Sequence, residues 1–199
     1  MDITLYRAEP ATESLSSATP RTRRNSQRLP GNVAYVVDNL WEHLRPLTMP
    51  CRRHAVYASP TRALARANLS AEDKGAGAVV YRVVISGPAT VAQLQVSDAR
   101  LHQDNSRIRR LVRERIGALQ EAAPAERREL GVLFWPGATA AEWTDMIAKS
   151  VLAREFVDEM TAVSTFWDDA TNFPADQAGE LFFELGPGAS YVAVDLQPA

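Results

Sequence analysis

The chain has few of the residues that build disulfides and metal sites. Its 199 residues include one cysteine, Cys51, and three scattered histidines. One cysteine cannot form a disulfide within the chain, and the histidines lack the spacing of metal ligands, so we expect no metal. Arg52 and Arg53 follow Cys51 and favour a thiolate there. No partnered base is evident, however, and a half-buried, unreactive thiol is the favoured interpretation.

Long apolar runs are also absent. No stretch reaches the roughly eighteen apolar residues of a membrane span, and Asp2, Glu9 and Glu13 occupy the region where a secretory signal needs an apolar core. We therefore expect no membrane insertion, and a protein that is cytoplasmic or is delivered to a target cell without a cleaved signal peptide. The net charge of −2 gives no global attraction to nucleic acid or anionic lipid.

The strand patterns are short and alternate with helical patterns along the chain. At 199 residues, a single domain over residues 1–199 is expected, with one hydrophobic core. Short strands that are scattered between helices and closed by a hairpin predict an α+β fold, in which helices surround a split, mostly antiparallel sheet. The predicted strands lie near Ile3, His54, Val79, Thr90, Leu181 and Tyr191.

The last predicted strand pair has an acid at its entrance. Residues 181–185 and 191–196 are rich in aromatic and β-branched side chains, and the Gly-Pro-Gly segment at 186–188 predicts the turn of a hairpin. Glu180 stands where a polar loop becomes an apolar strand, so a rigid element holds its carboxylate while it faces a cleft. Glu180 is therefore the candidate catalytic acid.

Two further predicted strands end in polar side chains. The alternation of residues 3–7 predicts a strand that ends at Arg7, and residues 54–59 predict a second strand that ends at Ser59. Pro60 follows Ser59 and suits the first turn of a helix, so helix capping alone would explain this serine. We expect Arg7 and Ser59 to face the same cleft, because both end strands beside a crevice.

Residues 8–31 are predicted to form a long loop that is mobile when no ligand is bound, because they are rich in serine, proline and arginine. Its arginines could clamp phosphates, although a solvated insertion is the favoured interpretation. A helix is predicted from Asn32, its N-cap, through Leu44. Residues 106–121 predict an amphipathic helix with a basic face, and a capping box at Thr139–Glu142 opens a further long helix.

Three short motifs, Tyr6-Arg7, Tyr57-Ala58-Ser59 and Glu180, occur in an order that resembles the mono-ADP-ribosyltransferase superfamily of the Arg-Ser-Glu type, a group of toxins and effectors. The resemblance implies that fold and an enzyme that cleaves the nicotinamide–ribose bond of NAD, its co-substrate. ADP-ribose would pass to a macromolecular acceptor, a protein or a nucleic acid. By resemblance, Glu180 stabilises the ribosyl cation, Arg7 holds phosphate or ribose oxygens, and Ser59 positions Glu180.

The resemblance also implies further contacts to NAD, from Tyr6, Tyr57 and Trp41. In the resembling enzymes a helix after the first strand borders the nicotinamide pocket, and Trp41 lies on the corresponding predicted helix; a core tryptophan is the commoner alternative. Arginine-modifying members carry a second glutamate two residues before the catalytic one. This chain has Ala178 there, so we do not expect arginine to be the acceptor.

Two alternatives stay open. The chain also resembles NAD hydrolase toxins of the RES kind, which share the Tyr-Arg start and a Tyr-Ser strand followed by a helix. That group carries a glutamate in this helix, whereas residues 64–66 offer none. In the second alternative, the chain is a non-enzymatic binding or immunity module whose loop over residues 8–31 and basic helix contact a partner. Glu180 would then be a strand-edge charge that opposes aggregation. The patterns indicate no oligomeric state.

Overall fold

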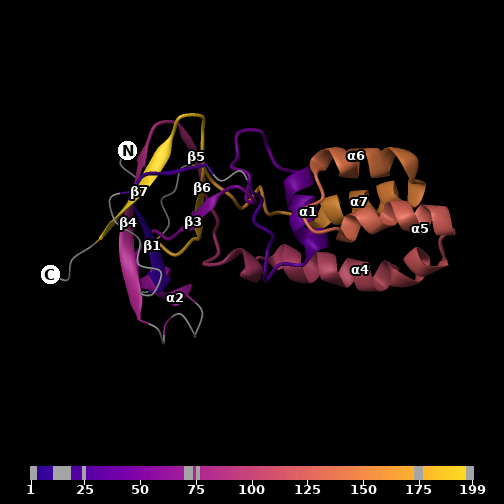
Figure 1. Ribbon diagram of the computed structural model, residues 1–199. Helices are drawn as coiled ribbons and strands as arrows, with labels where there is room; N and C mark the ends of the chain where they lie inside the picture. Colours follow the sequence, from indigo (N-terminus) through magenta and orange to yellow (C-terminus); the bar gives the residue numbers. More distant parts are fainter. Residues whose placement is uncertain are drawn as a thin grey trace. The chain divides into compact units, whose positions relative to one another are not determined.

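The strands and most of the helices belong to different parts of the chain. Contacts divide it into two compact units, and we describe each by itself. The sheet unit comprises Met1–Ser26, Leu47–Ala99 and Ala170–Ala199, and the helical unit comprises Gln27–Pro46 and Arg100–Asp169. The sequence predicted one domain over residues 1–199. The computed structural model (Figure 1) describes residues 4–10, 19–23, 26–69, 74, 77–172 and 177–195.

The larger sheet of the sheet unit has four antiparallel strands in the order β1-β4-β7-β2. The central strand β4 is the longest because residues 78–86 form an almost unbroken run of β-branched and aromatic side chains. It pairs with the N-terminal strand β1 on one side and with the last strand, β7, on the other. The strands span β1 Leu5–Pro10, β4 Ala78–Ser86, β7 Ser190–Asp195 and β2 Arg21–Thr22.

The smaller sheet has three antiparallel strands in the order β3-β6-β5. They span β3 Val56–Ala58, β6 Leu181–Leu185 and β5 Ala89–Gln93. The predicted turn forms at Gly186–Gly188, but the predicted hairpin does not: the strands on either side of the turn pair in different sheets, β6 in the smaller and β7 in the larger. Together with the helices, these antiparallel sheets confirm the predicted α+β class.

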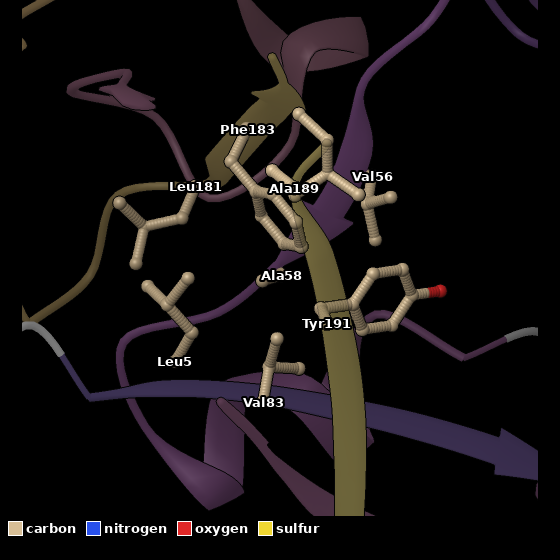
Figure 2. Close-up of a cluster of buried hydrophobic side chains, with 9 residues drawn as sticks. Leu5, Val56, Ala58, Val83, Leu181, Phe183, Ala189 and Tyr191 are labelled. Atoms are coloured by element: carbon tan, nitrogen blue, oxygen red, sulfur yellow. The ribbon is translucent and has the colours of Figure 1, made fainter. Parts of the chain in front are cut away.

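One apolar cluster joins the inner faces of the two sheets (Figure 2). Strand alternation sends every second side chain into it. The rings of Phe183 and Tyr191 meet edge to face there, with centroids 5.5 Å apart. Its members include Leu5 and Val83 from the larger sheet and Val56, Ala58, Leu181 and Leu185 from the smaller one.

The helical unit consists of amphipathic helices that bury tryptophan and phenylalanine. The capping box predicted at Thr139 and Glu142 is present, and it opens α6. No helix among the described residues is long and apolar enough to cross a membrane. The helices span α1 Tyr35–His43, α4 Gln103–Glu121, α5 Pro124–Leu130, α6 Ala140–Lys149 and α7 Val151–Val163, with a 3₁₀ turn, η3, at Gly131–Phe134.

A buried carboxylate ties three segments of the helical unit together. Asp104, in the first turn of α4, is completely buried. Its Oδ2 accepts hydrogen bonds from Trp41 Nε1 at 2.9 Å, Ser164 Oγ at 2.7 Å and Phe166 N at 3.2 Å. These donors come from α1 and from the segment after α7, so one side chain fixes the ends of three elements.

The structure corrects several predicted boundaries. β1 does not end at Arg7 but continues to Pro10, because β4 offers partner positions as far as Ala78. The helix predicted from Asn32 begins at Tyr35, after Ala34 in extended conformation. Within the predicted loop over residues 8–31, Ala8–Pro10 belong to β1 and Arg21–Thr22 form β2; residues 11–18 and 24–25 lie outside the described residues.

Candidate functional site

The first two predicted motifs meet in a backbone pairing between Tyr6 and Ser59. Tyr6 N donates to Ser59 O at 2.8 Å, and Ser59 N donates to Tyr6 O at 2.7 Å. This antiparallel bridge joins β1 of the larger sheet to the residue that follows β3 of the smaller one. Residues far apart in the sequence are thereby held at one junction between the sheets.

Ser59 and Glu180 occupy neighbouring strand ends. β3 and β6 are antiparallel, and the last pair of their ladder is Ala58 opposite Leu181. Ser59 follows Ala58 and Glu180 precedes Leu181, so continuing the same antiparallel register places Ser59 opposite Glu180. Tyr6, Ser59 and Glu180 therefore form a row across β1, β3 and the entrance of β6. We call this set the junction row.

Glu180 is anchored through both its backbone and its side chain. Glu180 N donates to Val96 O at 2.8 Å, and Glu180 O accepts from Leu94 N at 2.9 Å. The carboxylate Oε2 accepts a hydrogen bond from the backbone N–H of Ala99 at 3.0 Å. A bond from a backbone amide to an ionised carboxylate is among the stronger hydrogen bonds in proteins. The acid is thus held at a fixed position at the strand entrance.

The structure overturns the simplest explanation of Ser59. Helix α2, Arg62–Ala67, is capped by Thr61, whose Oγ1 accepts a hydrogen bond from Leu64 N at 3.1 Å. The helix begins later than predicted because the chain stays extended through Ser59 to pair with Tyr6. Ser59 is 97% buried, with 3% of its surface exposed, and it does not cap the helix.

Glu180 also does not lie on a sheet edge. Its strand β6 is the central strand of the smaller sheet, between β3 and β5. A charge that blocks edge-to-edge aggregation must stand on an edge strand, where unpaired backbone groups are exposed. The interpretation of Glu180 as a protective edge charge is therefore wrong.

The side chain of Arg7 is directed to an acid that the sequence analysis did not single out. Arg7 Nε donates to Glu9 Oε1 at 2.7 Å, and the Arg21 guanidinium lies 3.6 Å from the same oxygen. Alternation puts Leu5, Arg7 and Glu9 on one face of β1. Leu5 belongs to the apolar cluster, so this is the inner face of the sheet. Tyr6, the bridge partner of Ser59, points to the other face, so Arg7 and Ser59 do not share a face as predicted, and the Arg7 guanidinium is held by Glu9.

The predicted tyrosines have local partners. Tyr6 points to the opposite face of β1 from Arg7, and the Arg62 guanidinium lies 5.9 Å from its ring centroid. The Tyr57 hydroxyl donates to Arg52 O at 3.1 Å, and its ring stacks on Phe182 at 6.0 Å. Contacts of either tyrosine with NAD stay a prediction.

Trp41 belongs to the helical unit, whereas the other predicted site residues belong to the sheet unit. It is 1% exposed, its Nε1 donates to Asp104, and its ring stacks on Phe166 with centroids 4.0 Å apart. These contacts are those of a core tryptophan, the commoner alternative in the sequence analysis. A contact between Trp41 and nicotinamide stays a prediction, and it would require these buried groups to move.

A second acid on β6 also has structural partners. Glu184 Oε1 accepts two hydrogen bonds from Arg23, at 3.0 and 2.6 Å, and its Oε2 accepts one from Cys51 N at 2.8 Å. These bonds attach the segments around Arg23 and Cys51 to the smaller sheet. Glu184 thus serves as a comparison for Glu180, since it is on the same strand but away from the strand entrance.

No protein-family model, curated protein or solved structure matches the chain. Membership of the ADP-ribosyltransferase superfamily therefore stays a prediction. Within the described part of the chain, no three histidine, cysteine, aspartate or glutamate side chains form a group that could hold a metal ion.

Proposed function

We propose that the chain is an NAD-dependent ADP-ribosyltransferase that transfers ADP-ribose to a macromolecular acceptor other than arginine. The single observation that carries the proposal is the junction row. Tyr6, Ser59 and Glu180 come from three separate parts of the sequence, yet they lie on adjacent strands where the two sheets meet. The three motifs of the Arg-Ser-Glu pattern would each contribute to one site if this chain works as that superfamily does.

The reaction needs little more than such a site. When the bond between ribose C1′ and the nicotinamide nitrogen breaks, the neutral nicotinamide leaves with the electron pair and a cation develops on the ribose. A fixed carboxylate beside that ribose stabilises the cation most in the transition state. The acceptor then bonds to C1′ and loses its proton to solvent.

Each residue of the site has a role that its surroundings allow. Glu180, held by the Ala99 N–H, would stabilise the cation without having to be reoriented, which is the advantage of a preorganised group. Ser59 would orient the carboxylate of its neighbour in the junction row. Arg7 would bind phosphate oxygens through the Nη N–H groups of its guanidinium, since Glu9 accepts only from Nε.

The RES-like hydrolase alternative is less well supported. It requires a glutamate in the helix after the Tyr-Ser strand, and α2 contains none. Water would replace the macromolecular acceptor in that reaction, while the cleavage step would be the same.

The proposal is tested by incubating the purified chain with NAD and measuring free nicotinamide, in the presence and absence of a lysate. We expect release of nicotinamide and transfer of labelled ADP-ribose to a lysate macromolecule. Nicotinamide release without any labelled acceptor would favour the hydrolase. No release at millimolar NAD, with or without lysate, would contradict both enzymes.

A further inference from the structure

Two arginines from opposite edges of the larger sheet meet at one buried acid. β1 and β2 are the two edge strands, yet Arg7 and Glu9 on β1 and Arg21 on β2 form one charged cluster. The sheet must therefore curve so that its inner face brings its edges together. Arg21 pairs with Tyr191 in the β2–β7 ladder, and its Nη1 donates to the Tyr191 hydroxyl at 3.4 Å.

The acid in this cluster has an unused acceptor. Glu9 is 6% exposed, and its Oε2 is buried with no hydrogen-bond partner among the described residues. A buried carboxylate oxygen without a donor is costly, and native structures rarely leave one unexplained. The charge of Glu9 is balanced by Arg7 and Arg21, but no residue that the structure describes donates to Oε2. A ligand with a hydroxyl group would supply a donor.

The arginines around Glu9 keep donors for an anion. The one hydrogen bond of Arg7 among the described residues uses Nε, which leaves both Nη groups. The side chains of Arg7 and Arg21 are 25% and 28% exposed, so a ligand in solution can contact the cluster at these two arginines. With two guanidinium groups and one carboxylate, it carries a net charge of about +1 at neutral pH. Such groups bind phosphate through paired N–H donors.

We propose that Glu9, Arg7 and Arg21 form a subsite for a phosphorylated ribose. The guanidinium groups bind phosphate oxygens, and Glu9 Oε2 accepts a hydrogen bond from a ribose hydroxyl. The inference rests on the proposed function, because it assigns the ADP-ribose part of NAD to this cluster. It adds an acid that selects a sugar phosphate over a bare phosphate. Figure 2 shows the neighbouring Tyr191 ring packed in the apolar cluster with its hydroxyl at the edge.

Two ligands and one isosteric substitution separate this role from simple anion binding. Glu9→Gln keeps a carbonyl oxygen for Arg7 Nε but replaces Oε2 by an amide group, which cannot accept a hydroxyl hydrogen. The affinities of ADP-ribose and inorganic pyrophosphate are measured by calorimetry for wild type and Glu9→Gln. We expect the variant to bind ADP-ribose about tenfold more weakly, the size of one hydrogen bond to a charged group, and pyrophosphate no more weakly than wild type.

The control is Glu184→Gln, which alters another arginine-bound carboxylate of the sheet unit and should leave both affinities unchanged. Unchanged ADP-ribose binding by Glu9→Gln, or equal weakening of both ligands, would overturn the inference while leaving the proposed enzyme intact. Wild type that binds neither NAD nor ADP-ribose would overturn the proposed function as well. If Glu9→Gln does not fold, Arg21→Gln replaces it: it should weaken both ligands, and unchanged affinities would reject the subsite.

Discussion

A Cβ atom on Gly179 would overlap the carbonyl oxygen of Leu94. The backbone of the residue before the candidate catalytic acid is therefore packed directly against the end of β5. The neighbouring bonds from Leu94 to Glu180 and from Glu180 to Val96 continue this close approach. Only glycine fits at this position, so the place of Glu180 depends on the residue that precedes it.

Replacing Gly179 by alanine should move Glu180 away from its position. The β5 and β6 backbones must separate to accept the methyl group, and the Ala99–Glu180 hydrogen bond would be strained. We expect nicotinamide release to fall at least about tenfold, together with a lower melting temperature. The control is Gly117→Ala in the middle of α4, where nothing lies within 4 Å of the added carbon. It should raise helix stability by roughly 0.5–1 kcal/mol and leave activity unchanged.

Glu180→Gln should strongly slow catalysis and leave folding and NAD binding intact. The amide is nearly isosteric, while the lost charge acts chiefly on the developing cation. The loss should appear in kcat, by about 10²-fold if the interaction contributes roughly 3 kcal/mol to the transition state. Nicotinamide release is measured beside Glu184→Gln, which removes an acid bound to Arg23. Retained activity in Glu180→Gln, or its loss in a folded Glu184→Gln alone, would show that the catalytic acid is assigned wrongly.

Arg7→Lys should weaken NAD binding markedly. A lysine ammonium can pair with Glu9, but it cannot hold that carboxylate and present two further N–H groups to a phosphate at the same time. The dissociation constant of NAD is measured by calorimetry or by quenching of tryptophan fluorescence. An unchanged dissociation constant would mean that Arg7 has a structural role in the sheet and does not bind NAD.

Asp104→Asn should destabilise the helical unit. Oδ2 of the carboxylate accepts bonds from Trp41, Ser164 and Phe166, and Oδ1 accepts one from Thr165 N at 3.1 Å. Asparagine has one acceptor oxygen, so in either orientation its NH₂ group faces at least one of these donors. We expect a loss of about 3 kcal/mol in the free energy of unfolding, from urea titration. A loss below about 0.5 kcal/mol would contradict the anchoring role of Asp104.

His43 should make stability depend on pH. Burial lowers the pKa of His43 below its ordinary value of 6.5, against a smaller opposing effect of a hydrogen bond to the Ala140 backbone. Below pH 6.5 the unfolded chain therefore takes up a proton on His43 more readily than the folded chain does. Stability falls as the pH is lowered from 6.5 toward the lower pKa of His43 in the folded state. Well above pH 6.5, the histidine is neutral in both states and contributes no pH dependence.

The measurement compares melting temperatures of wild type and His43→Gln at pH 8 and pH 5. Glutamine does not titrate, so the variant should lose less stability than wild type between these two pH values. Equal losses would show that His43 is not the group responsible.

The sequence predicts the strands of the sheet unit well because their side-chain patterns are local. Alternation and β-branched runs identify β4, β5, β6 and β7, and the Gly-Pro-Gly segment identifies the turn. A shared cleft was predicted for Arg7 and Ser59, whereas the observed bridge joins Tyr6 to Ser59, because no local pattern specifies a bridge between two sheets. The helix cap was assigned to Ser59 instead of Thr61 because both residue types cap helices equally well in isolation.

Other features depend on three-dimensional context that the sequence does not display. β2 is too short to show any alternation, and it exists as a strand because the outer edge of β7 offers partners at Tyr191 and Ser190. Glu9 stands two residues after Arg7, and this spacing predicts a shared face in a strand. Its ion pair with Arg21, however, arises from the curvature of the sheet, which cannot be read from either segment alone.

The division of the sheet unit into three sequence segments sets an order of events during synthesis. β1, β3, β4 and β5 precede most of the helical unit on the chain, while β6 and β7 follow it. β6 is the central strand of its sheet and β7 separates β4 from β2, so neither sheet can close before both are made. All residues of the helical unit are therefore made before either sheet has its full set of strands. Until Leu181–Leu185 are made, the smaller sheet lacks its central strand, and Glu180 lacks the strand that holds it beside Leu94 and Val96.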